Sequence, residues 1–145
     1  MKRGEGSAPG RVPEGVLDAG VVLVRIDSRR RSHAEVVRLF RRSESGAVRL
    51  SVSAVNLAEA FQHSREYAAA TGLDLVSLLT AFRVAVHAPD AEVARRVAAL
   101  AALPDSSLAD RFAAATAEAL GARLYTTDVA LARALRKRRL PVTLF

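Results

Sequence analysis

Two spacings of hydrophobic residues alternate along the chain, one typical of strands and one typical of helices. Short apolar runs predict strands at residues 15–18, 48–52, 84–87, 123–126 and 141–145. The stretches between them place apolar residues every three or four positions, which predicts helices. For residues 21–26 a continued strand and a short helix are both open, because periodicity does not separate them. Strands that alternate with helices in this way predict an α/β domain with a mostly parallel, helix-covered sheet.

The predicted helices carry start and stop signals. Ser32 with Glu35, and Ser107 with Asp110, have the spacing of a capping box. Gly121 ends the second of these helices, because glycine adopts the left-handed conformation without steric cost. Further helices are predicted from Ser53 to a break at Gly72, from near Asp74, and over residues 90–103 and 129–138. Two packing faces are predicted, one made of Val55, Leu57, Ala58, Phe61 and Ala68 and the other of Leu108, Phe112, Ala115 and Ala119.

Length and composition indicate a single globular domain. The chain has 145 residues, of which 50% are hydrophobic, and it contains no cysteine for disulfides or thiolate metal sites. Residues 1–13 mix Gly, Pro, Ser and charge without periodicity, which predicts a flexible basic tail before a domain at residues 14–145. No signal peptide is recognisable, and the apolar run at residues 21–24 is too short to span a bilayer. We therefore expect a soluble, cytoplasmic protein with no membrane partner.

The charge of the chain favours a polyanionic partner. Lysine and arginine total 22 against 15 acidic residues, which gives a formal net charge of +7. Such a charge favours nucleic acid, because basic side chains neutralise phosphates and release counterions. The densest basic run has two compatible interpretations, a grip on phosphates or a complement to a helix C-terminus, and it consists of Arg136, Lys137, Arg138 and Arg139.

Four carboxylates lie where an α/β sheet forms its ligand site. Asp18 closes the first predicted strand and Asp128 closes the fourth. Glu59 lies about two turns into the helix after the second strand, and Asp110 lies in the opening turn of the helix that leads to the fourth. Taken singly, Asp110 and Asp128 are more simply explained as helix caps. Because ligands bind outside the carboxyl ends of parallel strands, we nevertheless predict that the four acids converge at one end of the sheet.

A cluster of carboxylates needs a cation, since like charges otherwise repel and favour protonation. Ligation by oxygen alone suits Mg²⁺ or Mn²⁺. Such ions lower the pKa of a bound water and stabilise a leaving oxygen, which suits cleavage of a phosphodiester. His63 follows Glu59 by one helical turn, but without an HExxH pattern a surface or hydrogen-bonded role is favoured over metal ligation.

Four segments in order resemble a known family. In sequence and spacing they resemble the PIN-domain signature, and more closely that of VapC-type toxins of bacterial toxin–antitoxin pairs: Val16–Asp18, Ser53–Glu59, Ser107–Asp110 and Tyr125–Asp128. The resemblance implies a three-layer α/β/α sandwich with a five-stranded parallel sheet of order 3-2-1-4-5. It also implies a Mg²⁺-dependent endoribonuclease that forms a homodimer and is inhibited by a small antitoxin. Metal binding and water activation would fall to Asp18, Glu59, Asp110 and Asp128, with Asn56 and Thr127 as supports.

Position 20 departs from the family pattern. The family usually has Ser or Thr two residues after its first Asp, whereas this chain has Gly20. A missing hydroxyl weakens the positioning of metal or water, so we expect Gly20→Ser to raise activity unless Gly20 has a left-handed backbone. The alternative function is therefore a catalytically impaired PIN-like module that binds nucleic acid or a partner. A receiver-type signalling domain fits less well, because both lysines, Lys2 and Lys137, are badly placed for it.

Overall fold

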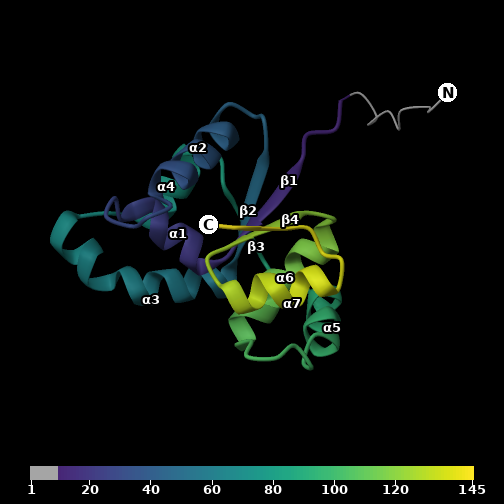
Figure 1. The fold of residues 1–145 in the computed structure, drawn as a ribbon. Helices are drawn as coiled ribbons and strands as arrows, with labels where there is room; N and C mark the ends of the chain where they lie inside the picture. The colour runs from purple at the N-terminus through teal and green to yellow at the C-terminus, as the bar shows by residue number, and fades with distance from the viewer. Residues whose placement is uncertain (1–9) are drawn as a thin grey trace.

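The computed structural model describes residues 10–145, in which five parallel strands form one sheet between two layers of helices (Figure 1). The strands are β1 (Glu14–Leu17), β2 (Arg49–Ser53), β3 (Ala85–His87), β4 (Arg123–Thr126) and β5 (Val142–Leu144). The helices are α1 (Ala19–Ile26), α2 (His33–Glu44), α3 (Ala54–Thr71), α4 (Leu75–Ala81), α5 (Ala91–Ala99), α6 (Leu108–Leu120) and α7 (Val129–Lys137). The strand order β3-β2-β1-β4-β5 and the helix layers confirm the predicted α/β/α sandwich.

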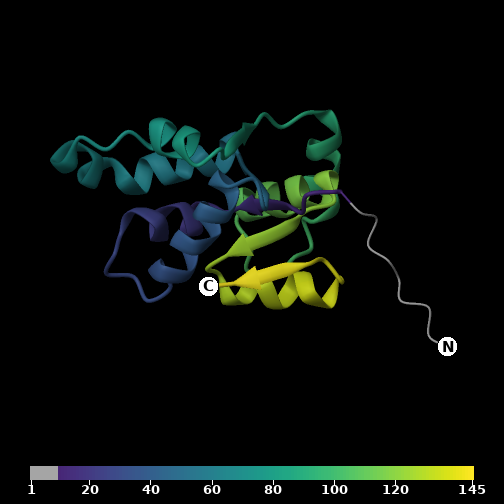
Figure 2. The ribbon, with the colours of Figure 1, turned by 90° about the horizontal axis from the view of Figure 1, so that it is seen from above.

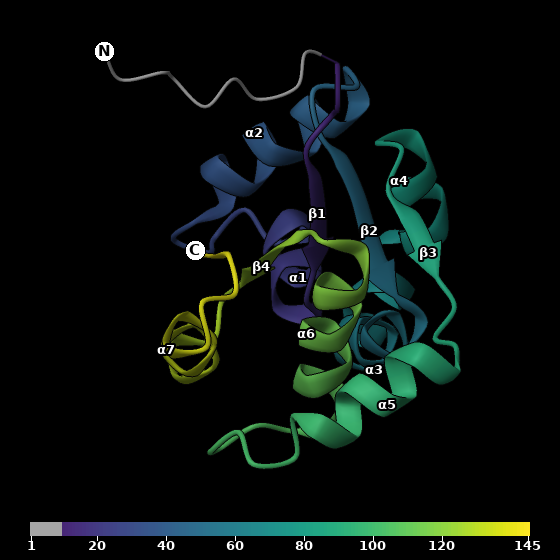
Figure 3. The ribbon, with the colours of Figure 1, turned by 90° about the vertical axis from the view of Figure 1, so that its right-hand side faces the viewer.

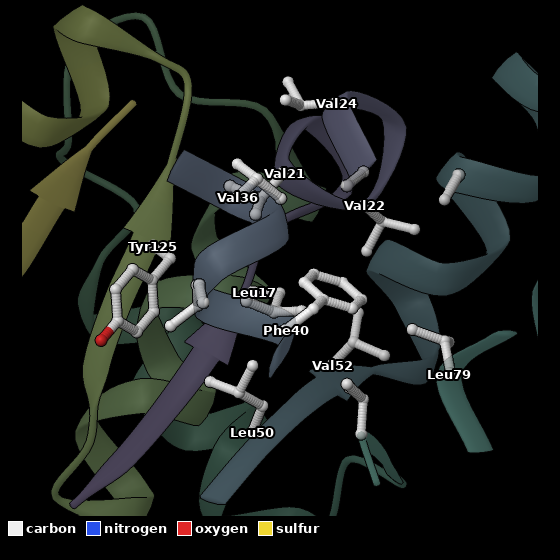
Figure 4. Close-up of a cluster of buried hydrophobic side chains, with 14 of the residues drawn as sticks. Leu17, Val21, Val22, Val24, Val36, Phe40, Leu50, Val52, Leu79 and Tyr125 are labelled. Atoms are coloured by element: carbon white, nitrogen blue, oxygen red, sulfur yellow. The ribbon is translucent and has the colours of Figure 1, made fainter. Parts of the chain in front are cut away.

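Each face of the sheet has its own hydrophobic core, because successive strand residues point to opposite faces. Val16 of β1 belongs to a cluster with α5, α6 and α7, whereas Leu17 belongs to one with α1, α2, α3 and α4. Figure 4 shows the second cluster, where the fully buried Phe40 of α2 lies beside Leu17 and Val52. Burial of such side chains stabilises both layers by roughly 25 cal/mol per Å² of apolar surface.

Helix α6 lies between α5 and α7 in its layer (Figure 3). Its buried residues are small, and they are Ala113, Ala114, Ala115, Thr116 and Ala117. The predicted packing face is therefore wrong in part, since Leu108 is exposed and Phe112 and Ala119 are only partly buried. Small side chains let the α6 backbone approach the sheet closely, and close packing makes alanine the buried residue here.

Several local predictions also need correction. Ser32 makes no capping hydrogen bond, because its ψ of 11° is not the extended conformation of a cap. The helix predicted over residues 90–103 ends at Ala99, and Pro104 disfavours helical backbone in the residue before it. Of the two structures that the sequence leaves open for residues 21–26, the helix is the one present, as part of α1. In α3, Ala58 and Phe61 are exposed, and the buried face consists of Asn56, Leu57, Ala60 and Ser64.

All strands run in the same direction, so their carboxyl ends meet at one edge of the sheet (Figure 2). Helices α1, α3 and α7 begin at this edge, because each follows a strand directly. Helix α6 leads back into β4, so its first turn also lies there. The chain reverses its winding between β1 and β4, and such a switch point is where open α/β sheets bind ligands.

The structure describes only the last part of the predicted tail at residues 1–13. Residues 1–9 of this tail lie outside the described residues. The Arg49 amide donates a hydrogen bond to the Pro13 carbonyl at 2.9 Å, which extends the β1–β2 ladder by one residue. The boundary at residue 14 stays a prediction. Among residues 10–145, no helix has both the length and the apolar character needed to cross a membrane.

Candidate active site

Asp18 follows β1 directly and is fixed from three sides. Its amide donates to the Tyr125 carbonyl of β4 at 3.0 Å. As the N-cap of α1, it accepts a hydrogen bond at Oδ1 from the Val21 amide at 2.9 Å. Its Oδ2 accepts one from the Thr126 hydroxyl. Only 5% of the residue is exposed, so the carboxylate has one orientation before any ligand binds.

Asp110 and Asp128 are also helix caps, as the simpler interpretation of each acid predicts. In the capping box of α6, Asp110 Oδ2 accepts from the Ser107 amide at 2.9 Å, and the Ser107 hydroxyl accepts from the Asp110 amide at 3.0 Å. Asp128 caps α7 through Oδ1, which accepts from the Leu131 amide at 2.9 Å. In each aspartate the second oxygen has no hydrogen-bond donor within residues 10–145. Capping and ligand binding are therefore compatible.

Helix α3 contributes Glu59 and, one turn earlier, Asn56. Asn56 is 1% exposed, and its Nδ2 donates to the Ala109 carbonyl at 3.0 Å. This bond ties α3 to the first turn of α6, next to Asp110. Asn56 Oδ1 is buried and has no partner in the described part of the chain. Glu59 is half-buried and makes no hydrogen bond or ion pair with the residues that the structure describes.

The four acids line one open pocket of about 240 Å³, called here the acidic hollow. Its other lining residues are Ala19, Gly20, Leu23, His63 and Thr127. The structure thus brings the acids together at the switch point, as the sequence predicts, while their roles in metal binding and catalysis stay predictions. Asn56 does not line the hollow. His63, which sequence patterns disfavour as a ligand, borders the hollow.

Burial raises the pKa of Asp18 from 3.8 to about 6. Hydrogen bonds from the Thr126 hydroxyl and from the amides of Val21 and Thr127 lower this pKa, and the negative charge of Asp110 raises it. Asp18 and Asp128 are the N-caps of α1 and α7, and Asp110 lies in the first turn of α6, where it completes the capping box of Ser107. The positive dipole ends of these helices therefore face the acids and offset part of the repulsion among them.

Residues 15–137 match the family model for the PIN domain. This span holds all four acids of the hollow, the strands β2, β3 and β4, all of β1 but its first residue, and the whole of α7. The chain belongs to the PIN domain family. No curated protein matches its sequence.

Several solved structures share this PIN fold at low sequence identity. VapBC2 from Rickettsia felis, bound to a DNA fragment from the promoter, matches with a TM-score of 0.69 and 15% identity over 91% of this chain and 98% of that one. VapC20 from Mycobacterium tuberculosis, described as a sarcin–ricin loop cleaving toxin, matches with a TM-score of 0.62 and 17% identity over 83% and 94%. A toxin–antitoxin complex from Klebsiella pneumoniae matches with a TM-score of 0.58 and 17% identity over 79% and 86%. At these identities the likeness establishes the fold alone.

PIN domains generally use divalent metal ions, and the donors of the acidic hollow fit such an ion. Within residues 10–145, no three His, Cys, Asp or Glu side chains are already gathered as a ligand set around one point. The four carboxylates thus line one hollow without forming such a set. Oxygen donors of this kind suit Mg²⁺, which keeps several waters and needs only one or two direct carboxylate ligands.

The predicted nucleic-acid-binding run lies outside the acidic hollow. It occupies the C-terminal end of α7 and the residues just after it, and all of it is exposed: Arg136, Lys137, Arg138 and Arg139. Asp128 caps the opposite end of α7, about 13 Å away at 1.5 Å per residue. The exposed Arg133 lies between them on the same helix. It is a further positive charge on α7 between this run and Asp128, which the sequence pattern missed because it stands outside the contiguous basic run.

Proposed function

We propose that this PIN domain is a divalent-metal-dependent endoribonuclease, the toxin of a VapBC-type toxin–antitoxin pair. The observation that carries the proposal is that Asp18, Glu59, Asp110 and Asp128 line one hollow at the carboxyl edge of the sheet. Capping alone does not require this meeting, because the three aspartates cap three different helices. A cation bound between the acids explains it.

Each acid has a proposed part in holding Mg²⁺ or Mn²⁺. Asp18 offers the remaining lone pairs of two oxygens that hydrogen bonds already orient. Asp110 and Asp128 offer the oxygens that capping leaves free. Glu59, which no other described residue holds, is free to turn toward the ion. Ions of this kind lower the pKa of a bound water and stabilise a leaving oxygen.

RNA is the proposed substrate. The net charge of +7 supports phosphate binding, and the basic residues of α7 form a track that leads toward the hollow. One solved structure of this fold, VapC20, is described as a toxin that cleaves the sarcin–ricin loop. An RNA strand bound by residues 136–139 and by Arg133 would approach the acids along α7.

The proposed protein partners are a cognate antitoxin and a second copy of the chain. Solved structures of the same fold include toxin–antitoxin complexes, which supports the first partner. The homodimer rests on the family resemblance. A cytoplasmic location is proposed with them, because the RNA substrate and the antitoxin are expected there.

A competing function is that of a catalytically impaired PIN module, which binds nucleic acid or a partner without cleaving RNA. The observation that favours it is Gly20, which lines the hollow and offers no side chain. RNA binding without cleavage in any divalent ion is the result that this function predicts.

Cleavage of RNA by the purified full-length chain, in Mg²⁺, Mn²⁺ or EDTA, distinguishes the two functions. Asp110→Asn removes a charge from the hollow and keeps a capping side chain, so we expect loss of cleavage with an intact fold. Asp105→Asn is the matched control, because Asp105 is exposed, lies outside the acidic hollow and has a φ of 52°, which asparagine tolerates. Equal cleavage by both variants would show that Asp110 is only a cap.

A further inference from the structure

The backbone conformation at position 20 does not require glycine. Gly20 is the second residue of α1, and its φ lies outside the left-handed region, so any residue fits the backbone there. A Cβ atom at this position would, however, overlap the Thr127 hydroxyl oxygen. It would also lie 3.4 Å from Thr127 Cβ and 3.4 Å from Asp18 Oδ1. The Thr127 side chain therefore fills the space that a side chain at position 20 needs.

The Thr127 hydroxyl is free to form hydrogen bonds at the acidic hollow. It borders the same small volume as Asp18 Oδ1, and Thr127 lines the hollow. The neighbouring Thr126 hydroxyl is already engaged, since it donates to Asp18 and accepts from the Asp128 amide at 3.0 Å. The Thr127 hydroxyl, by contrast, makes no hydrogen bond to any group in residues 10–145. It keeps a free donor and free acceptor positions beside the buried carboxylate.

We propose that Gly20 and Thr127 act as a pair, in which Gly20 leaves room for the Thr127 hydroxyl and this hydroxyl orients water around a divalent ion beside Asp18. Thr127 is a positioning residue in this arrangement, which rests on the proposed metal site. Supports of this kind change metal affinity or activity by about 10- to 100-fold. The geometry also reverses our expectation for Gly20→Ser. The hydroxyl is supplied instead by Thr127, which lies between β4 and α7, and a serine at position 20 would collide with it.

Binding of Mn²⁺ alone to the full chain, measured by calorimetry, tests the hydroxyl without relying on cleavage. Thr127→Val removes the hydroxyl and keeps the shape of the side chain, so we expect Mn²⁺ affinity to fall by about 10-fold or more. Thr127→Ser keeps the hydroxyl and should retain wild-type affinity. Thr80→Val is the matched control, because the Thr80 hydroxyl is exposed on α4 and donates only to the Val76 carbonyl. Unchanged affinity in Thr127→Val would overturn the proposal.

A double-mutant cycle tests the pairing itself. Gly20→Ser alone forces the Thr127 side chain out of its place, so we expect a lower melting temperature and weaker Mn²⁺ binding. Thr127→Ala alone removes the hydroxyl and weakens Mn²⁺ binding. The combination of Gly20→Ser with Thr127→Ala puts one hydroxyl into the vacated space and should recover both quantities. Losses that simply add in the double variant would refute the pairing.

The same measurements separate failure of this inference from failure of the proposed function. If the wild-type chain binds neither Mn²⁺ nor Mg²⁺, the metal-dependent function fails and the inference fails with it. If the wild-type chain binds Mn²⁺ and cleaves RNA while Thr127→Val binds Mn²⁺ equally well, only the inference fails.

Discussion

Asparagine in place of Asp18 would remove a buried charge while keeping the size and the capping oxygen of the side chain. In the wild-type chain this residue is 5% exposed, and its pKa is raised from 3.8 to about 6, chiefly because burial penalises the ionised form. The shift is about 2 pKa units, and at about 1.4 kcal/mol per unit it corresponds to about 3 kcal/mol. Without a metal, the ionised carboxylate therefore destabilises the folded chain by a free energy of this order.

The direction of the shift determines the pH range of the effect. Because the folded-state pKa is raised, the folded chain binds this proton more tightly than the unfolded chain does between the two pKa values. The free energy of unfolding of the wild-type chain therefore falls as pH rises from about 4 to about 6. We expect Asp18→Asn to be more stable than wild type by up to about 3 kcal/mol at pH 7.5, and to lose most of this advantage at pH 4.

Urea denaturation in EDTA across this pH range measures the difference in the free energy of unfolding. Asp105→Asn, at an exposed aspartate outside the acidic hollow, should show no such gain. Adding Mg²⁺ at pH 7.5 should stabilise the wild-type chain and not Asp18→Asn, because a ligand stabilises only the state that binds it. If Asp18→Asn is the less stable protein at pH 7.5 in EDTA, the reasoning is wrong and the carboxylate acts mainly as a stabilising cap.

Two further predictions concern residues around the acids. Asn56→Ala removes the hydrogen bond to the Ala109 carbonyl, so the free energy of unfolding should fall by about 1 kcal/mol and Mn²⁺ affinity should fall with it, as the turn that carries Asp110 loosens. Ser64→Ala, at another buried polar residue of α3, should leave Mn²⁺ affinity unchanged, and equal affinities would exclude Asn56 from the site. Glutamine at all four positions 136–139 should weaken RNA binding and reduce the salt slope, measured by fluorescence anisotropy, by about 3 for four contacts to a single strand. An unchanged salt slope would show that these residues do not contact phosphates and only complement the dipole at the C-terminal end of α7.

The meeting of the acids follows from the sequence because strand ends determine it. Asp18 and Asp128 follow short apolar runs, and parallel strands finish at one edge of the sheet. The capping signal at Ser107 fixes where α6 begins, and that start places Asp110 at the same edge. Each of these inferences needs only local patterns and the rule for parallel sheets, so no tertiary contact had to be known.

The sequence patterns did not predict which side chains of the helices are buried or which distant residues are in contact. Large apolar residues dominate a hydrophobic pattern, yet Leu108 is 56% exposed and Phe61 is 44% exposed, while the alanines of α6 are buried. Asn56 is polar and sits in the buried face of α3, because its amide spans the gap to α6. Gly20 and Thr127 lie against each other although they are far apart in the sequence, one near the start of the domain and one near its end. No local pattern predicts such a contact, and from the sequence Gly20 is only a missing hydroxyl.

The three aspartates of the acidic hollow are part of the fold and of the proposed site at the same time. A cap stabilises a helix by about 1 kcal/mol, and here each capping bond also holds one carboxylate oxygen in place and leaves lone pairs for a cation. The positive ends of the helices offset part of the charge repulsion and leave the free carboxylate oxygens accessible to a cation. The unfavourable free energy that remains is concentrated at Asp18, where burial is greatest, and it is relieved only when a proton or a cation binds. Glu59 caps no helix, so of the four acids it is the one that capping bonds do not hold in place, and in the proposed site an ion or substrate would fix its position.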